Sequence, residues 1–267
     1  TGFISSLYAP ADGEHVQTGE RCFYTPYNAR YLDAACAAIR KYVPFAEQCY
    51  FTAPLLSEAS VHANTAGIFK GFYKNSKTGT GQFGGDGRNA LNRICGKIEL
   101  PFPVFSAFSC PYRIFRKEAN ELAQSAELYD GLSCGEFDVA YIDPPYNQHP
   151  YGSNYFMLNL VASYEQPDSE KISRVSGIPR GWNRSMYNRK KFAADTLRAL
   201  SQSLRAKFLI VSFNSDGFIS REEMSELLAE TGKVTVLEYP YNTFRASRNL
   251  CEREIHVKEY LFVVEKN

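Results

Sequence analysis

The sequence has no apolar run of the length that crosses a membrane, no closely spaced cysteine pair and almost no net charge. A membrane-spanning helix needs about 18 or more consecutive apolar residues, and no such run exists among these 267. The first residues, TGFISSLYAP, lack the basic start and apolar stretch of a secretory signal. The chain begins with Thr rather than Met, which indicates that something was removed or that it is a fragment.

The seven cysteines are an odd number and show no C-x-x-C spacing. Disulfide frameworks of small secreted proteins have even counts, and metal sites usually contain close pairs. The four histidines are scattered as well. We therefore expect reduced thiols, a cytoplasmic protein and no metal site.

Lysine and arginine are entirely missing from residues 118–170, which carry 10 acidic side chains. The chain as a whole has a net charge of +1, so its positive charges lie elsewhere: residues 61–117 sum to +7 and residues 171–207 to +9. A basic block that neutralises phosphates releases counterions, as a polyanion-binding surface requires. The alternative is that the blocks are solvated faces that pair with each other, and charge alone leaves both open.

The amino-terminal part reads as helical with a flexible interruption. Residues 29–42 place apolar side chains at helical spacing, and 53–74 predict a second, longer helical stretch that is loosened around Asn64 and Gly67. Residues 74–88 are rich in glycine and predict a loop or flexible arm. The short apolar runs of 98–115 are broken by prolines, which is typical of irregular strands.

From about residue 108 the pattern alternates between strands and helices, which predicts a doubly wound α/β domain. The mostly apolar FDVAYI (137–142) predicts a strand buried on both faces. The last two strands alternate in polarity and predict an antiparallel pair. We expect strands at 112–116, 137–142, 207–213, 234–241 and 257–265, and helices at 119–128, 155–163, 189–204 and 220–230.

Asp143-Pro144-Pro145-Tyr146 directly follows this buried strand. Ligands of open α/β sheets bind beyond the carboxyl ends of the strands. The prolines make a stiff turn, so the carboxylate of Asp143 and the carbonyl of Pro144 can accept both hydrogens of an exocyclic amino group. Tyr146 can stack on the base that carries it. The plainer reading is a proline turn after a strand-end aspartate.

DPPY after FDVAYI resembles the catalytic motif of amino-methyltransferases that use S-adenosylmethionine to methylate adenine in DNA. The order of the motifs is similar to the DNA adenine methylase subgroup, in which target recognition lies between the cofactor motif and the catalytic motif. The resemblance extends over YTPYNARYLDAACAAIR (24–40), HANTAGIFKGFYK (62–74), KEANELA (117–123), DPPYNQHPYGSNYFMLNLVASY (143–164), FLIVSFNSDGFIS (208–220) and YNTFRASRN…VKEYLFVVEK (241–266).

This resemblance implies a doubly wound, Rossmann-like methyltransferase sheet with an antiparallel carboxyl-terminal hairpin, plus a mostly helical target-recognition region. Residues 1–20 would be a remnant of the cofactor-binding part, 21–107 the DNA-binding target-recognition region and 108–267 the catalytic domain. The glycine-rich F-x-G-x-G cofactor loop of the family is missing, and no apolar strand precedes the glycines of 81–87. The chain therefore looks truncated at its amino terminus.

The resemblance also implies roles for single residues. Asp143, Pro144, Pro145 and Tyr146 match the positions that hold and stack the flipped adenine. Glu118 with Ala119, and Asp143 again, match cofactor-binding positions, although the family more often has Asp where this chain has Glu118. Asn154 and Tyr155 match a helix that borders the pocket. The candidate phosphate contacts are Lys70, Lys74, Lys77 and Arg88.

The implied reaction transfers a methyl group from S-adenosylmethionine to the 6-amino group of adenine in a specific sequence of double-stranded DNA, after base flipping. The resemblance also admits a cognate restriction endonuclease as a partner. Three alternatives stay open. Cytosine 4-amino methyltransferases more often have Ser at the position of Asp143, and protein glutamine methyltransferases usually have Asn there. A DNA-binding subunit that needs a partner for cofactor binding is the third.

Overall fold

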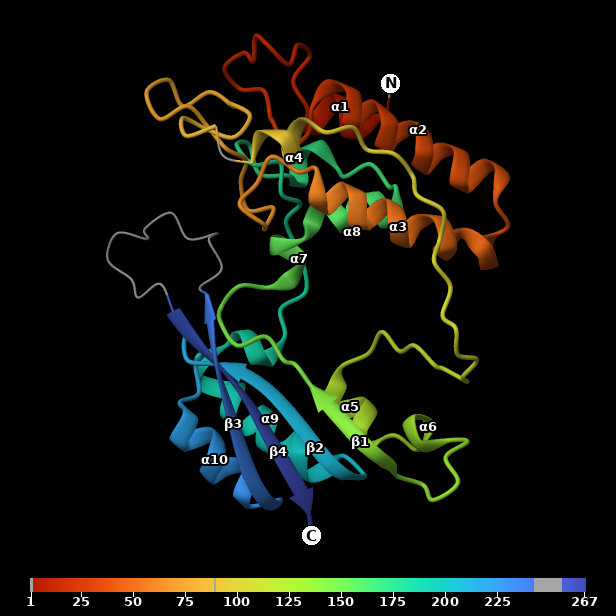
Figure 1. Ribbon diagram of the computed structural model, residues 1–267, viewed down its shortest axis with the longest axis vertical. Coiled ribbons are helices and arrows are strands. Elements are labelled where there is room, and N and C mark those ends of the chain that lie inside the picture. Colours follow the sequence, from red (N-terminus) through yellow and green to blue (C-terminus); the bar gives the residue numbers. More distant parts are fainter. Residues whose placement is uncertain (1, 89, 243–255) are drawn as a thin grey trace. The chain divides into compact units, whose positions relative to one another are not determined.

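The computed structural model describes residues 2–88, 90–242 and 256–267, which fall into two compact units (Figure 1). The first unit contains the residues up to Ser109 together with Tyr151–Trp182. The second contains Cys110–Pro150 and most of the chain after Trp182. None of the described helices is both long enough and apolar enough to cross a membrane.

The first unit is helical. Its second helix begins where Thr25 accepts a hydrogen bond from the backbone N–H of Asn28 and Pro26 occupies the first turn, a position that proline favours. The described elements are α1 (Phe3–Tyr8), α2 (Pro26–Tyr42), η1 (Phe45–Glu47), α3 (Gln48–Val61), α4 (Leu91–Cys95), α7 (Tyr151–Asn154), α8 (Phe156–Ser163) and η2 (Ser169–Lys171).

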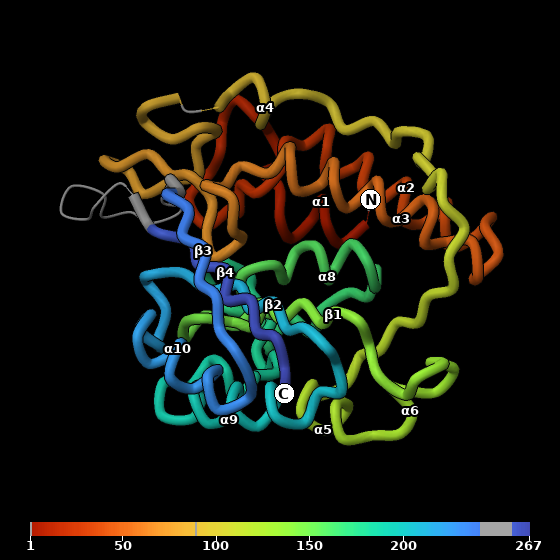
Figure 2. The backbone as a smooth tube through the Cα atoms, turned by 60° about the horizontal axis from the view of Figure 1, so that its bottom comes forward, coloured from red at the N-terminus to blue at the C-terminus, as the bar shows by residue number. Residues whose placement is uncertain are grey.

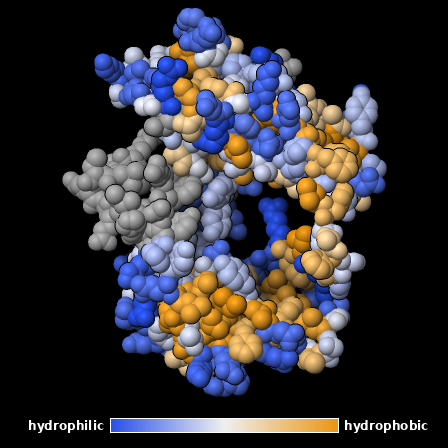
Figure 3. Space-filling view, viewed as in Figure 1, coloured by the Kyte–Doolittle hydropathy of each residue, from blue (hydrophilic) through white to orange (hydrophobic). Residues whose placement is uncertain are grey.

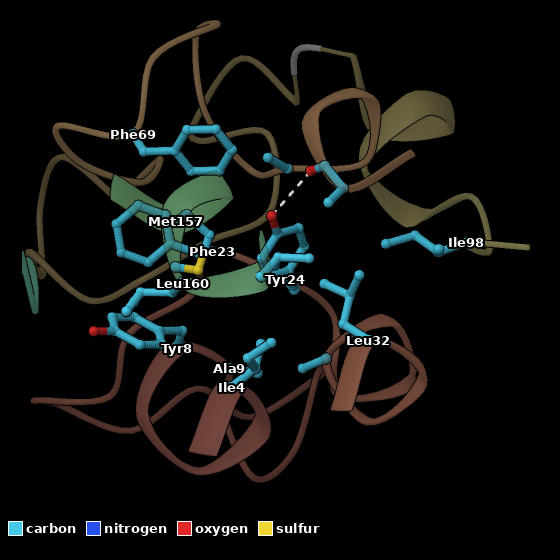
Figure 4. Packing of buried hydrophobic residues seen from close by; sticks show 14 of the residues in the cluster. Ile4, Tyr8, Ala9, Phe23, Tyr24, Leu32, Phe69, Ile98, Met157 and Leu160 are labelled. Atoms are coloured by element: carbon cyan, nitrogen blue, oxygen red, sulfur yellow. Dashed lines mark hydrogen bonds between the residues drawn. The ribbon is translucent and has the colours of Figure 1, made fainter. Parts of the chain in front are cut away.

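Aromatic side chains form the centre of the first unit (Figure 4). Phe23 is fully buried, and its ring contacts four others, those of Tyr8, Phe69, Phe72 and Phe156. The last of these lies on α8, which buries one apolar face, formed by Phe156, Met157, Leu160 and Val161, in the same core. For this reason residues 151–182 join the first unit, whereas we had expected a catalytic domain running without interruption from 108 to 267.

The expected helix at 53–74 is wrong in its second half. The observed α3 starts earlier, at Gln48, and ends at Val61. Beyond it, the buried side chain of Asn64 donates to the carbonyls of Cys22 (2.7 Å) and Gln82 (3.2 Å) and accepts from the N–H of Gly84 (3.0 Å). These bonds to distant backbone groups replace helical ones, so tertiary structure overrides the local pattern.

The second unit contains a four-stranded mixed sheet with the order β1-β2-β4-β3 (Figure 1). β1 and β2 are parallel, whereas β4 pairs antiparallel with both β2 and β3. A mixed α/β fold is therefore confirmed; residues 243–255, between β3 and β4, lie outside the described ranges. The elements are α5 (Ala119–Gln124), α6 (Ala126–Tyr129), β1 (Phe137–Ile142), η3 (Met186–Asn188), α9 (Lys190–Ser203), β2 (Ala206–Asn214), α10 (Arg221–Ala229), β3 (Gly232–Asn242) and β4 (His256–Lys266).

Helices α9 and α10 cover one face of this sheet, and both ribbon views place them on the same side of the strands (Figures 1 and 2). The alternate residues Leu209, Val211, Phe262 and Val264 point into this layer and are almost completely buried. As the sequence predicted, Ser220 caps α10 by accepting from the N–H of Glu223 (3.1 Å). This packing supplies the core of the second unit.

The other face of the sheet, which we call the uncovered face, exposes apolar side chains (Figure 3). Val139 pairs with Phe208 and Leu237 with Leu261, and all four are more than a third exposed. Tyr141, on β1, is 62% exposed. The expectation that 137–142 is buried on both faces is therefore wrong, because no described helix of this unit packs on this side.

The predicted strand at 112–116 does not form, and Ile114 within it is 86% exposed. Strands require a hydrogen-bonded partner. Among the described residues, β1 is an edge strand that pairs only with β2. The predicted helix 119–128 also splits into α5 and α6, because Ser125 ends the first and caps the second.

Candidate functional site

The ends of three strands meet at one edge of the sheet. Ile142, the last residue of β1, pairs with Val211 of the parallel strand β2, so the carboxyl ends of both strands lie side by side. Asp143 follows β1 immediately, and Asn214 ends β2. Asn214 in turn pairs with Glu259, near the start of β4. We refer to Asp143, Asn214 and Glu259 as the strand-end cluster.

Both carboxylates of the strand-end cluster have raised pKa values. Partial burial raises the pKa of Asp143. Burial also raises the pKa of Glu259, and the charge of Asp143 raises it further, whereas a hydrogen bond from Asn214 opposes both effects. The side-chain oxygen of Asn214 is already used, since it accepts from the N–H of Asp216 (3.1 Å). Its amide nitrogen is thus the group oriented toward Glu259.

The loop of residues 143–147 carries the residues predicted to be catalytic, and we call it the catalytic loop. It is held from two sides. The ring of Tyr146 packs edge-on against Phe213, with 6.0 Å between centroids and 75° between planes. Its carbonyl accepts from the N–H of Phe218 (2.9 Å). The carbonyl of Asn147 accepts from the side-chain amide of Asn188 (2.9 Å). These contacts fix the loop beyond the stiffness that its prolines provide.

The raised pKa of Glu259 predicts a pH-dependent stability. A carboxyl whose pKa is higher in the folded state stabilises the protein fully below its unfolded pKa, and this contribution disappears as the pH rises through the folded pKa. Glu259→Gln, which keeps an acceptor for Asn214, should therefore raise the thermal unfolding midpoint of the second unit at pH 7 to 8. The gain should vanish near pH 4. Thermal unfolding followed at several pH values measures it.

Glu265→Gln is the matched control, because Glu265 is an exposed residue of the same strand. It should leave the midpoint unchanged at both pH values. A Glu259→Gln midpoint that equals the native one across the whole pH range would contradict the assignment.

Part of the chain that carries this site is similar to known proteins. Residues 122–224, which include the catalytic loop and Asn214, match the model of the D12 class N6 adenine-specific DNA methyltransferases. Over this segment, which is less than half of the chain, the protein is similar to the D12 methyltransferase family. Its enzymes methylate adenine in DNA, the reaction for which an amino-group site after β1 is suited.

Curated relatives match the methyltransferase over nearly its whole length. The type II methyltransferase M.CviAII of Paramecium bursaria Chlorella virus 1 is 27% identical over 266 residues, covering 98% of this chain and 70% of the relative. M.NlaIII of Neisseria lactamica, also a type II methyltransferase, is 26% identical over 272 residues, covering 99% and 72%. No solved structure matches significantly.

The predicted cofactor residues Glu118 and Ala119 lie at the start of α5 in the methyltransferase. The Glu118 carboxylate accepts from the N–H of Glu121 (2.9 Å) and so caps this helix. Burial and, to a smaller extent, the charge of Glu118 raise the pKa of Tyr187. The hydroxyl of Tyr187 donates to Asn120 (2.9 Å). A role for Glu118 toward the cofactor stays a prediction.

The predicted phosphate contacts all lie in the first unit. Lys70 is half-buried, and burial lowers its pKa. The ammonium of Lys74 lies 5.2 Å from the ring centroid of Phe72. Lys77 is exposed on a turn in which its own backbone N–H donates to the side chain of Asn75. Arg88 is also exposed, and its backbone has the left-handed conformation. Lys77 and Arg88 are thus more accessible to phosphate than Lys70, and the role of all four remains a prediction.

The sequence did not predict Asn214 and Glu259 as site residues, because no short motif marks them. Both come together only through the strand pairing of β2 with β4. The available signal was an asparagine at the end of a buried apolar strand, the position at which such sheets bind ligands. Asn188, which fixes the catalytic loop, lies in the basic stretch and gave no signal.

Two other kinds of site do not compete with the strand-end cluster. Among the residues that the structure describes, no group of three or more His, Cys, Asp or Glu could hold a metal ion. A cavity of about 760 Å³ lies in the first unit, between α1, the loop after it and the start of α2. None of the predicted catalytic residues lines this cavity.

Proposed function

We propose that the protein transfers a methyl group from S-adenosylmethionine to the 6-amino group of adenine within a specific sequence of double-stranded DNA. The observation that carries this proposal is the position of Asp143-Pro144-Pro145-Tyr146 at the carboxyl end of β1, beside the end of β2. The match of residues 122–224 to adenine-specific methyltransferases supports it. The unpaired described cysteines fit a reducing compartment such as the cytoplasm.

The strand-end cluster fits a cationic methyl donor. Asp143 and Glu259 form no ion pair with any residue that the structure describes, so their negative charges are available to a positive ligand. When bound, S-adenosylmethionine supplies an electrophilic methyl group on a sulfonium centre. Glu118 and Ala119 would hold the adenosine part at the start of α5.

The loop residues act on the adenine amino group. Its lone pair is delocalised into the ring, which makes the nitrogen a poor nucleophile. The Asp143 carboxylate and the Pro144 carbonyl accept its two hydrogens and favour a pyramidal nitrogen, whose lone pair is free for in-line attack. The nitrogen would gain a bond to the methyl carbon as the bond between that carbon and the sulfonium sulfur breaks, which leaves a neutral thioether. The nitrogen would then lose one proton to the carboxylate of Asp143.

Base flipping brings the adenine to this loop. Inside a duplex the amino group cannot reach a recessed site, so the nucleotide has to leave the stack at a cost of a few kcal/mol. The ring of Tyr146, held edge-on by Phe213, stacks on the extruded base.

The product decides between the proposal and its cytosine alternative. Duplex DNA from a host without methylation would be incubated with the protein and isotope-labelled S-adenosylmethionine, then digested to nucleosides for mass spectrometry. We expect labelled N6-methyladenine. Labelled N4-methylcytosine would support the cytosine alternative instead. If the protein binds DNA but methylates neither adenine nor cytosine, both the proposal and the cytosine alternative are overturned.

A second candidate is a DNA-binding subunit that needs another polypeptide segment to complete its cofactor site. The uncovered face and the free edge of β1 favour it, because a strand and helices from another segment could pair and pack there. Calorimetric titration separates the candidates: saturable binding of S-adenosylmethionine by the 267 residues alone excludes the subunit.

A further inference from the structure

A small β-hairpin lies between the catalytic loop and the return of the chain to the second unit. Ile172 and Pro179 form an antiparallel bridge. The N–H of Ser173 donates to Ile178 (2.8 Å), and the N–H of Gly177 donates back to Ser173 (2.8 Å). Gly177 has a φ of +68°, the left-handed conformation that closes such a turn. We call residues 171–180 the basic hairpin.

One buried and one partly buried side chain of the first unit hold the backbone of the basic hairpin. The hydroxyl of Tyr8 donates to the carbonyl of Gly177 (2.8 Å). The guanidinium of Arg21 donates to the carbonyls of Ser173 (3.3 Å) and Arg174 (3.1 Å). A Cβ placed on Gly177 would lie 2.7 Å from both Tyr8 and Arg21. The turn is therefore seated directly on the core.

The side chains of the basic hairpin that face solvent carry unneutralised positive charge. Arg174 and Arg180 are exposed, and neither forms an ion pair with another described residue. Lys171 differs, because its ammonium pairs with Asp168 (3.2 Å). Because the backbone of the hairpin is already ordered, binding through these two arginines requires no further ordering of the backbone, and a guanidinium matches phosphate with two hydrogen bonds.

We infer that the basic hairpin binds the phosphate backbone of duplex DNA through Arg174 and Arg180. The inference rests on the proposed function, since it takes duplex DNA as the substrate. The basic hairpin would be a second DNA contact, in addition to the glycine-rich segment 74–88. In the sequence it follows the catalytic loop and α8. The first unit then contributes candidate DNA-binding residues from two stretches of the chain, 70–88 and 171–180.

The salt dependence of DNA binding tests this inference. Each phosphate contact contributes about 0.9 to the slope of log K against log salt concentration. The double variant Arg174→Ala/Arg180→Ala should reduce the magnitude of that slope by about 2. It should also weaken binding at ~0.1 M salt by roughly tenfold or more. Fluorescence anisotropy of a labelled duplex over a range of NaCl concentrations gives both values. An unchanged slope would overturn the inference.

Matched variants separate charge from folding. Arg174→Lys keeps the charge and should keep the slope, whereas Lys171→Ala removes a charge that Asp168 already neutralises and should change it little. Gly177→Ala should displace the turn and weaken DNA binding with both arginines in place. A slope in Lys171→Ala as low as in the double variant would count against the assignment to Arg174 and Arg180.

The two hypotheses fail in different ways. If native protein and double variant bind DNA alike while N6-methyladenine is produced, only the basic hairpin is wrong. If binding depends on the two arginines but no methylated base is found, only the proposed methyl transfer is wrong. Native protein that does not bind duplex DNA overturns the inference directly.

Discussion

Asp143→Ala is expected to reduce methyl transfer by about a hundred- to a thousandfold and to leave DNA binding unchanged. The substitution removes a charged acceptor that lies directly at the end of β1. Without it, the adenine nitrogen keeps its lone pair in the ring and loses the carboxylate that takes its proton. Rates of isotope-labelled methyl transfer, with DNA affinity from anisotropy, give the two quantities.

Asp138→Ala provides the control for Asp143→Ala. Asp138 lies on β1, the strand that leads to Asp143, is exposed, and pairs with Lys207 on β2 (2.7 Å). Its removal should leave both the transfer rate and DNA affinity unchanged. Asp143→Asn should fall between native protein and Asp143→Ala, because an amide oxygen still accepts one hydrogen bond. Native transfer by Asp143→Ala would sink the proposed mechanism.

Phe23→Ala is expected to destabilise the first unit by about 3–5 kcal/mol, the usual loss for a phenylalanine deleted from a core. The ring is fully buried and contacts four other aromatic rings, so few neighbours can move into the space that it leaves. Phe156 on α8 is one of these neighbours, and the variant should therefore also loosen residues 151–182. Urea unfolding, monitored through the hydrogen exchange of backbone amides in each unit, measures the loss of stability.

Phe102→Ala serves as the comparison, since Phe102 is 85% exposed in the same unit. It should change the free energy of unfolding by less than about 0.5 kcal/mol. The second unit should keep its native protection in both variants, because its own core, built on β2, β4, α9 and α10, contains neither residue. Equal destabilisation of both units by Phe23→Ala would argue that they unfold as one.

The sequence predicted the elements whose pattern is local. The strands at 137–142 and 207–213 formed within one residue of their expected bounds, and the catalytic loop lies at the strand end, as expected. The cap of α10 was also correct, because Ser220 and Glu223 are only three residues apart. In each case the residues that decide the structure lie within one turn or one strand of each other.

What the sequence did not predict depends on distant partners. Asn64 breaks the expected helix by binding backbone groups of residues 22, 82 and 84. Glu259 comes next to Asn214 only through β-pairing across more than forty residues. The segment 112–116 stays outside the sheet although the outer edge of β1 pairs with no described strand, and its local pattern gives no sign of this.

The edge of β1, which pairs with no described strand on its outer side, and the apolar uncovered face favour self-association of the second unit. Salt affects this self-association and the DNA binding inferred for the first unit in opposite directions. An unpaired, apolar edge strand is a template onto which another chain can add its own strand. Sulfate and phosphate salts strengthen such apolar association, while the same salts weaken binding to the DNA backbone. Solution conditions that detach nucleic acid from the basic hairpin therefore promote aggregation through the sheet, and both processes have to be controlled in the same buffer.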